Sequence, residues 1–210
     1  MNVTSDLQIC SSLHGITPES VNQHIYYYRD WRLPMSLHFP QDTISKFVAT
    51  SVAQLPLSPD ARILDIPCGF GRHARWFASH GYAVVGLDID EKRISSAREL
   101  SQAASVPIQW GVADIEKLLP FPNANFDVVV VVHYVSDHII EAARRALKPD
   151  GYLIFETFDA RGQNWRTLPL RGSIRDTLEH GFEIVNIHER AVGPELTHAV
   201  VRVLARRCDG

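Results

Sequence analysis

The sequence has few cysteines and lacks a long apolar run. Its three cysteines, Cys10, Cys68 and Cys208, are an odd number and lack the paired spacing of a metal site. That pattern is typical of a reducing compartment, so we expect a cytoplasmic protein that holds no metal. The first 15 residues lack the basic start and apolar centre of a signal peptide. No segment is apolar over the length that spans a bilayer, so we expect no membrane partner.

An excess of one charge is also lacking. The 21 Lys and Arg residues against 24 Asp and Glu residues give a net charge of −3, without a basic run. A phosphate-binding track is therefore not predicted, and we expect no nucleic-acid partner. The chain length suits one main domain with a single core. We expect residues 1–54 to form an N-terminal arm and helical lid, residues 55–210 to form the main domain, and the protein to be a monomer or a homodimer.

The segment from Arg62 to Phe77 combines a short apolar strand, two glycines and a helical pattern. Gly69 and Gly71 allow a sharp turn and the close approach of a ligand to the backbone. The helix that follows directs free N–H groups and the positive end of its dipole at that ligand. This arrangement indicates a nucleotide-type site.

Two acidic residues qualify that interpretation. Gly69 to Ala74 also fits the dinucleotide pattern, with Ala74 in the last glycine position. Asp65, however, would repel a pyrophosphate and attract a cation such as an ammonium or a sulfonium group. Asp88 ends the next apolar segment, near the offset of about 20 residues at which a carboxylate binds ribose hydroxyls. Asp88 therefore indicates a ribose without choosing between the two kinds of ligand.

Strands and helices alternate along the chain, which predicts an α/β fold with a doubly wound, mainly parallel sheet. The last two strands follow one another without a helix and should pair antiparallel. Ligands of such sheets bind at the carboxyl ends of the strands, where we expect Gly69, Asp88, Asp114 and His133 to gather. After the first strand, the expected strands are Tyr82–Leu87, Ile108–Val112, Phe126–Val132, Tyr152–Thr157, Phe182–His188 and Ala199–Ala205. Besides the helix after Gly71, the expected helices are Thr43–Ala53, Glu91–Ala104, Asp137–Leu147 and Gly172–His180.

Two motifs resemble those of the class I S-adenosylmethionine-dependent methyltransferases. The first is Asp65 with Gly69 and Gly71, where Pro67 replaces the first glycine of the family motif. The second is Leu-Lys-Pro-Asp-Gly, ending at Gly151, before an apolar strand. The resemblance covers roughly Leu55 to the C-terminus, and the closing part has a weaker likeness to tellurite-resistance and thiopurine methyltransferases. It implies that residues 55–210 form an S-adenosylmethionine-binding methyltransferase domain with a Rossmann-like seven-stranded sheet, mostly parallel, whose last strand is antiparallel.

The same resemblance implies the residues of the site. The methionine end of the cofactor would lie over Gly69 and Gly71, with its ammonium near Asp65 and its ribose on Asp88. A pair after the third strand would flank the adenine. The implied cofactor-binding residues are Asp65, Pro67, Cys68, Gly69, Gly71, Asp88, Ile89, Asp114, Ile115 and His133.

His133 and Tyr134 leave the fourth strand beside the transferring methyl group and are the candidate catalytic residues. A histidine has a suitable pKa for a base, although His133 could equally be an ordinary polar residue at a strand end. Asp114 could equally be a turn residue. Cys68 suits packing beside the motif better than nucleophilic chemistry, and His73 is expected to cap or pack the motif helix.

Three functions follow from these observations. The first is methyl transfer from S-adenosylmethionine to a small-molecule acceptor by in-line displacement. The alternatives are an NAD(P)-dependent oxidoreductase, which leaves Asp65 and the closing hairpin unexplained, and a methyltransferase-like protein that binds the cofactor without turnover. We expect a partly apolar acceptor between the segments Tyr26–Arg32 and Phe158–Pro169, each of which carries tryptophan and arginine. Trp31 and Trp165 could instead be packing residues.

Overall fold

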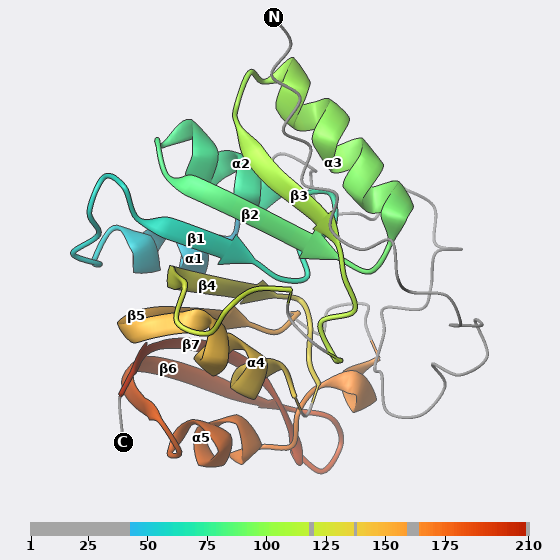
Figure 1. Ribbon diagram of the computed structural model, residues 1–210. Coiled ribbons are helices and arrows are strands. Elements are labelled where there is room, and N and C mark those ends of the chain that lie inside the picture. The colour runs from blue at the N-terminus through green and yellow to red at the C-terminus, as the bar shows by residue number, and fades with distance from the viewer. Residues whose placement is uncertain (1–42, 118–119, 137, 159–163, 209–210) are drawn as a thin grey trace, which may run out of the picture.

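The computed structural model describes residues 43–117, 120–136, 138–158 and 164–208 (Figure 1). Most of the expected N-terminal arm and lid, including Tyr26–Arg32, lies outside the described residues. The elements are, in chain order, α1 (Lys46–Val52), β1 (Arg62–Asp65), α2 (Arg72–Ser79), β2 (Ala83–Asp88), α3 (Glu91–Ala103), β3 (Ile108–Val112), β4 (Phe126–Val132), α4 (Ile139–Ala146), β5 (Leu147–Glu156), the 3-10 helix η2 (Trp165–Thr167), α5 (Ser173–Leu178), β6 (Phe182–Val192) and β7 (His198–Arg207).

The sheet has seven strands in the order β3-β2-β1-β4-β5-β7-β6. The pairs β3–β2, β2–β1, β1–β4 and β4–β5 are parallel, whereas β7 runs antiparallel to both β5 and β6. This arrangement confirms the predicted doubly wound sheet with an antiparallel last strand. Strand order reverses between β1 and β4, so the carboxyl ends of these two strands mark the crevice where such sheets bind ligands.

Helices cover both faces of the sheet (Figure 1). Val48 of α1 and Phe77 of α2 pack with Val130 on one face. Ile139 of α4 packs with Val129 on the other face. Successive residues of a strand point to opposite faces, and β4 is apolar along almost its whole length because both of its faces are buried. No helix in the described part of the chain has the length and apolar character needed to cross a membrane.

Several element bounds differ from the sequence prediction. α1 begins at Lys46 rather than Thr43 because the Ser45 hydroxyl accepts a hydrogen bond from the Phe47 N–H at 3.1 Å and caps the helix. α4 spans residues 139–146 instead of the expected 137–147. β6 and β7 are longer than expected because their antiparallel ladder continues to the pair Val192 and His198.

β5 begins at Leu147 rather than at Tyr152. Leu147 pairs with Phe126 of β4, and the next pair joins Tyr152 to Val128, so residues 148–151 form a bulge inside the ladder. Asp150 in this bulge has a left-handed backbone, with φ of 61°. The Leu-Lys-Pro-Asp-Gly segment, expected before the strand, therefore lies within β5.

The indole ring of Trp110 in β3 packs directly against the backbone at two glycines, Gly71 and Gly86. A Cβ atom built on Gly71 would lie 2.2 Å from the ring carbon Cη2 of Trp110, and one on Gly86 would lie 2.3 Å from Cζ3. The indole Nε1 donates a hydrogen bond to the Ser101 hydroxyl of α3 at 3.0 Å, which fixes the ring. Gly71 therefore has a packing role that the sequence did not predict, in addition to its φ of 73° at the N-terminus of α2.

We predict that Gly71→Ala lowers the free energy of unfolding by about 3 kcal/mol, because overpacking against Trp110 adds to the cost of a left-handed alanine. Gly81→Ala is the matched control, since Gly81 also has a positive φ, 90°, but a Cβ there meets no atom of the described residues within 4 Å. It should cost only about 1–2 kcal/mol. Urea denaturation of both variants measures the difference, and equal losses would contradict the packing role.

Candidate functional site

The turn between β1 and α2 lies at the carboxyl edge of the sheet and leaves space beside its first glycine. Gly69 has a φ of 56°, and a Cβ built on it would meet no atom of the described residues within 4 Å. Next to it, the Cys68 N–H donates to the Leu87 carbonyl of β2 at 2.8 Å, which joins the turn to the neighbouring strand. A left-handed residue without a side chain beside open space is what a ligand lying against the backbone requires.

Asp88 fastens the same turn from the end of β2. Its Oδ2 accepts a hydrogen bond from the Gly69 N–H at 2.8 Å, and its Oδ1 accepts one from the Asp90 N–H at 3.0 Å. The side chain is buried, yet a carboxylate oxygen can accept more than one hydrogen bond, so capacity remains for hydroxyl donors. Asp90, not Asp88, caps α3, because its Oδ1 accepts from the Lys92 N–H at 2.9 Å. Asp88 is therefore not needed as the helix cap.

Asp65 is buried at the end of β1, where its Oδ2 accepts a hydrogen bond from the Ala74 N–H of α2 at 3.1 Å. Burial raises the pKa of this carboxyl to about 7, although the bond from Ala74 and the charge of Arg72 act against the shift. The group is thus close to half ionised at neutral pH. Burial, together with Asp65 and Asp88, raises the pKa of the Cys68 thiol well above its usual value. A protonated, buried thiol agrees with the expected packing role of Cys68.

His133 and Tyr134 follow β4 and differ in their surroundings. His133 is half-buried, has a left-handed backbone with φ of 60°, and donates its N–H to the Glu156 carbonyl at 2.7 Å. Tyr134 is buried, and its hydroxyl donates to Glu116, which also accepts a hydrogen bond from the Ser136 hydroxyl at 2.7 Å. The sequence did not single out Glu116. Its contact occupies the Tyr134 hydroxyl, whereas His133 lies at the strand exit itself.

The residues predicted to flank the adenine lie in the turn after β3. The Asp114 carboxylate accepts a hydrogen bond from the Glu116 N–H at 3.1 Å and lies 3.3 Å from the Lys117 ammonium. The Ile115 side chain is buried in the core. Pro67 and Ile89 are half-buried in the segments that follow β1 and β2. These contacts give Asp114 a role in its own turn, and its place beside an adenine stays a prediction.

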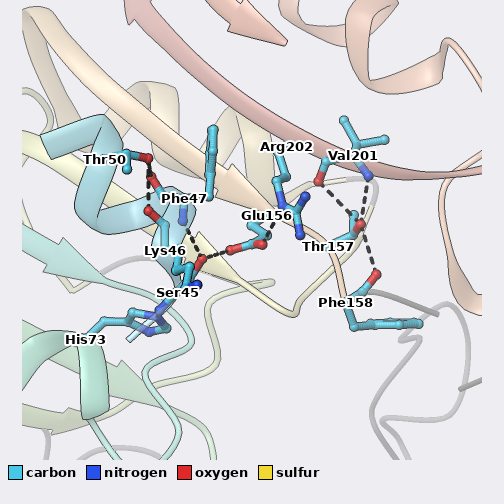
Figure 2. A network of polar contacts seen from close by, with 10 residues as sticks. All are labelled: Ser45, Lys46, Phe47, Thr50, His73, Glu156, Thr157, Phe158, Val201 and Arg202. Carbon is cyan, nitrogen blue, oxygen red and sulfur yellow. Dashed lines mark hydrogen bonds and ion pairs between the residues drawn. The ribbon is translucent and has the colours of Figure 1, made fainter. Parts of the chain in front are cut away.

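A polar network that the sequence analysis missed lies near the ends of β5 and α2 (Figure 2). Glu156 is buried at the end of β5, accepts a hydrogen bond from the Ser45 hydroxyl, and pairs with Arg202 of β7, whose Nε lies 2.7 Å from its Oε1. The Ser45 N–H donates to Nε2 of His73 at 3.3 Å. The sequence could have indicated this network, because Glu156 directly follows apolar residues of a buried strand and is therefore expected to be a buried carboxylate that needs a partner.

His73 is the second residue of α2 and is buried. Burial lowers its pKa to about 3, and the charges of Arg72 and His133 act in the same direction. The ring is therefore neutral, with Nε2 as an acceptor and the proton on Nδ1. This agrees with the expected packing role of His73.

Trp165, in the loop after β5, lies against the β6–β7 hairpin. A Cβ built on Gly193 would be 2.8 Å from its ring, and the ring of His198 packs edge-on against it at 5.0 Å between centroids. The Arg166 guanidinium lies over the same indole, 4.6 Å from its centroid. These contacts support the packing alternative for Trp165. Residues 159–163 of the Phe158–Pro169 segment, which was expected to enclose the acceptor, lie outside the described residues.

Comparison with known proteins finds methyltransferases among both the family models and the similar sequences. A family model described as "Methyltransferase domain" matches residues 64–155. The 27-O-demethylrifamycin SV methyltransferase of Amycolatopsis mediterranei is 32% identical over 126 residues, 56% of this chain and 46% of that protein. The chain spans about half the length of several curated relatives that it matches.

Solved structures extend the likeness. An S-adenosylmethionine-dependent methyltransferase from Mesorhizobium loti is 28% identical, with a TM-score of 0.56 over 76% of this chain and 96% of that one. The [4+2]-cyclase SpnF has a TM-score of 0.65 at 17% identity, over 89% of this chain and 87% of that one. The second likeness concerns the fold alone, and a shared fold does not fix a reaction.

We predict that Asp65 makes stability depend on pH. Its pKa of about 7 exceeds the ordinary value of 3.8, so the folded protein holds a proton that the unfolded chain has released. The stabilisation from that proton is complete below about pH 4 and is lost as the pH rises through about 7. The free energy of unfolding of the wild type, relative to Asp65→Asn, should therefore fall by a few kcal/mol across this range.

Asp60→Asn is the control for this measurement. Asp60 is exposed, and a hydrogen bond from Ser58 lowers its pKa, so its effect should have the opposite sign and be confined to acid pH. Denaturant titrations at several pH values provide the comparison. A difference between wild type and Asp65→Asn that does not change from pH 4 to pH 8 would contradict the assignment.

Proposed function

This chain belongs to the class I S-adenosylmethionine-dependent methyltransferases, and we propose that it transfers a methyl group from S-adenosylmethionine to a small-molecule acceptor. The observation that carries the proposal is the turn at Gly69. Among the described residues, no atom lies within 4 Å of a Cβ built on this left-handed glycine, and the Asp88 carboxylate holds the turn from the neighbouring strand. We further expect a cytoplasmic monomer or homodimer without a nucleic-acid or membrane partner.

The chain's own residues fit the two ends of this cofactor. The backbone at Gly69 and the start of α2 would hold the methionine end, and Asp65 in its ionised form would attract the ammonium group. Asp88 would accept hydrogen bonds from the ribose hydroxyls, and its carboxylate is already oriented by two backbone N–H groups. Asp114 and Ile115 would flank the adenine. When bound, S-adenosylmethionine supplies a methyl group on a sulfonium sulfur, which is a good leaving group.

The protein's part in the reaction is then alignment of the acceptor, a contribution that can be worth about 7–11 kcal/mol. His133 is the better of the two candidates for accepting a proton from an acceptor that arrives protonated. It leaves β4 at the carboxyl edge, whereas the Tyr134 hydroxyl is engaged by Glu116. The hydrogen bond from Tyr134 to Glu116 instead suits a structural role, in which it holds the segment after β3 against the segment after β4.

The nicotinamide alternative is not favoured. Asp65 is buried at the end of β1, just before the turn on which a pyrophosphate would lie, and the family model is that of a methyltransferase domain. Binding of the cofactor without turnover is the alternative that an experiment must separate from catalysis.

We predict that S-adenosylhomocysteine binds the full chain in a calorimetric titration and that NAD⁺ does not. Asp88→Asn should weaken S-adenosylhomocysteine by about 1–3 kcal/mol, because hydrogen bonds to a charged group are lost. Asp90→Asn is the matched control, since asparagine caps a helix as well as aspartate does, and its affinity should match the wild type.

The outcomes separate the three functions. Binding of NAD⁺ instead of S-adenosylhomocysteine would overturn the proposal, and equal losses in the two variants would remove Asp88 from the ribose site. Binding of S-adenosylhomocysteine without transfer of labelled methyl to any of a panel of small hydroxylated, aminated or thiolated acceptors would favour the non-catalytic alternative.

We also predict that Gly69→Ala weakens S-adenosylhomocysteine by about tenfold or more while costing only about 1–2 kcal/mol of stability, since its methyl group would enter the open space beside the turn. Gly81→Ala has the same backbone strain at a distance from the site and should leave the affinity unchanged. Calorimetry and urea denaturation of both variants test this. Full affinity in Gly69→Ala would exclude close approach of the ligand at this turn.

A further inference from the structure

Arg202 and Glu156 face each other across β7 and β5 at the carboxyl end of β5. The Arg202 Nε lies 2.7 Å from Oε1 of Glu156. The Glu156 side chain is only 7% exposed, whereas that of Arg202 is 42% exposed. The Glu156 carboxylate is therefore buried, and part of the Arg202 side chain reaches the surface.

Glu156 is held from a second side. Its other carboxylate oxygen accepts a hydrogen bond from the Ser45 hydroxyl, and the Ser45 N–H donates to His73 (Figure 2). With both oxygens bonded, the carboxylate has little freedom to rotate. The hydrogen bond that Arg202 donates to Glu156 therefore orients the Arg202 guanidinium.

Arg206 provides an internal comparison on the same strand. It lies four residues further along β7, so it is on the same face, and its side chain is 40% exposed. Its Nε and Nη2 bond to Glu183 at 3.0 and 2.5 Å, and its Nη1 bonds to Asp150 at 3.2 Å. Two carboxylates thus engage all three nitrogens of Arg206.

Arg202 differs because only its Nε is engaged. Within the described part of the chain, its guanidinium makes no hydrogen bond or ion pair except that with Glu156. Its two Nη groups carry four further N–H donors, in the planar arrangement that suits a carboxylate or a phosphate. Arg202 is partly exposed and oriented by Glu156, and the N–H donors on its two Nη atoms remain available to an anion.

The position of Arg202 relates this anion site to the acceptor. The His133 N–H donates to the Glu156 carbonyl at 2.7 Å, so the ends of β4 and β5 are adjacent. The residue paired with Arg202 is thus bonded to the candidate base. A group held by the Nη atoms would lie on the β5–β7 side of the sheet, opposite the β1–β2 side that carries Asp65 and Asp88.

We propose that Arg202 is a specificity-determining residue that binds an oxyanion, a carboxylate or a phosphate, on the methyl acceptor. The connection to an acceptor rests on the proposed function, whereas the anion site is a property of Arg202 and Glu156 alone. Acceptors with an acidic group would then be preferred over neutral ones of the same shape.

Binding of aromatic acids to the full chain saturated with S-adenosylhomocysteine tests this, monitored by NMR titration. The probes are benzoate for a carboxylate, phenyl phosphate for a phosphate, and benzyl alcohol as the neutral compound. We expect at least one anion to bind more tightly than benzyl alcohol, and Arg202→Met to weaken that anion about tenfold or more while leaving benzyl alcohol unchanged. Arg206→Met is the matched control and should change anion binding less than twofold. Tighter binding of benzoate would indicate a carboxylate on the acceptor, and tighter binding of phenyl phosphate would indicate a phosphate.

Arg202→Lys provides a second variant in case Arg202→Met does not fold. It keeps the charge beside Glu156 but loses the planar fork, so the affinity for the anion should lie between those of the wild type and Arg202→Met. Absence of anion binding by the wild type at millimolar concentration would overturn the proposal. Wild-type anion affinity in Arg202→Met would also overturn it, and so would wild-type affinity in Arg202→Lys if only that variant folds. An equal loss of anion affinity in Arg206→Met would overturn it as well.

The same titrations in protein without S-adenosylhomocysteine separate this proposal from the proposed function. If the wild type fails to bind S-adenosylhomocysteine but still binds the anion through Arg202, the proposed function fails and the anion site stands. If S-adenosylhomocysteine binds and the anion does not, the anion site fails and the proposed function is unaffected.

Discussion

Two buried carboxylates hold the turn on which the site depends. Asp65 receives a backbone N–H from the first turns of α2, at Ala74, and Asp88 receives one from Gly69. Both acids lie at the carboxyl edge of a parallel sheet, where burial makes an unsatisfied acceptor costly. These two bonds join the turn at Gly69 to the end of β2, and the start of α2 to the end of β1. The groups that orient the turn are therefore also the groups proposed to bind the cofactor.

The half of the sheet that contains β5 and β7 differs from the half that contains Asp65 and Asp88, because it includes antiparallel strands. The strands β3, β2, β1, β4 and β5 are adjacent and parallel, so their carboxyl ends lie along the same edge. β7 runs antiparallel to β5 and places Arg202 opposite Glu156 at the end of β5. Ser45 connects the two sides, because it bonds both to His73 of α2 and to Glu156 of β5. A chain of polar contacts thus runs from α2 through Ser45 to β5 and β7 at this edge.

Much of this fold could be predicted from the sequence, because the apolar strands, the glycines and the acids at strand ends are local patterns. The bounds of β3 and β4, the antiparallel last strand and the positions of Asp65 and Asp88 follow from them. Contacts between distant residues could not be predicted. Trp110 restricts Gly71 only after β3 has packed beside β2, and Glu156 gains its partner only when β7 lies next to β5. No strand pattern signals the bulge at residues 148–151, since it depends on pairing with β4.

The order of the strands also has a consequence for synthesis on the ribosome. β1 to β4 lie in one continuous stretch of chain, so this part of the sheet can form as it emerges. β5 can pair with β4 as soon as it is made, but its other edge pairs with β7, the seventh strand of this sheet along the chain. Until then β5 presents unpaired backbone groups of the kind that other chains can bind. A truncated or slowly completed chain would therefore expose the β5 edge and be at risk of aggregation.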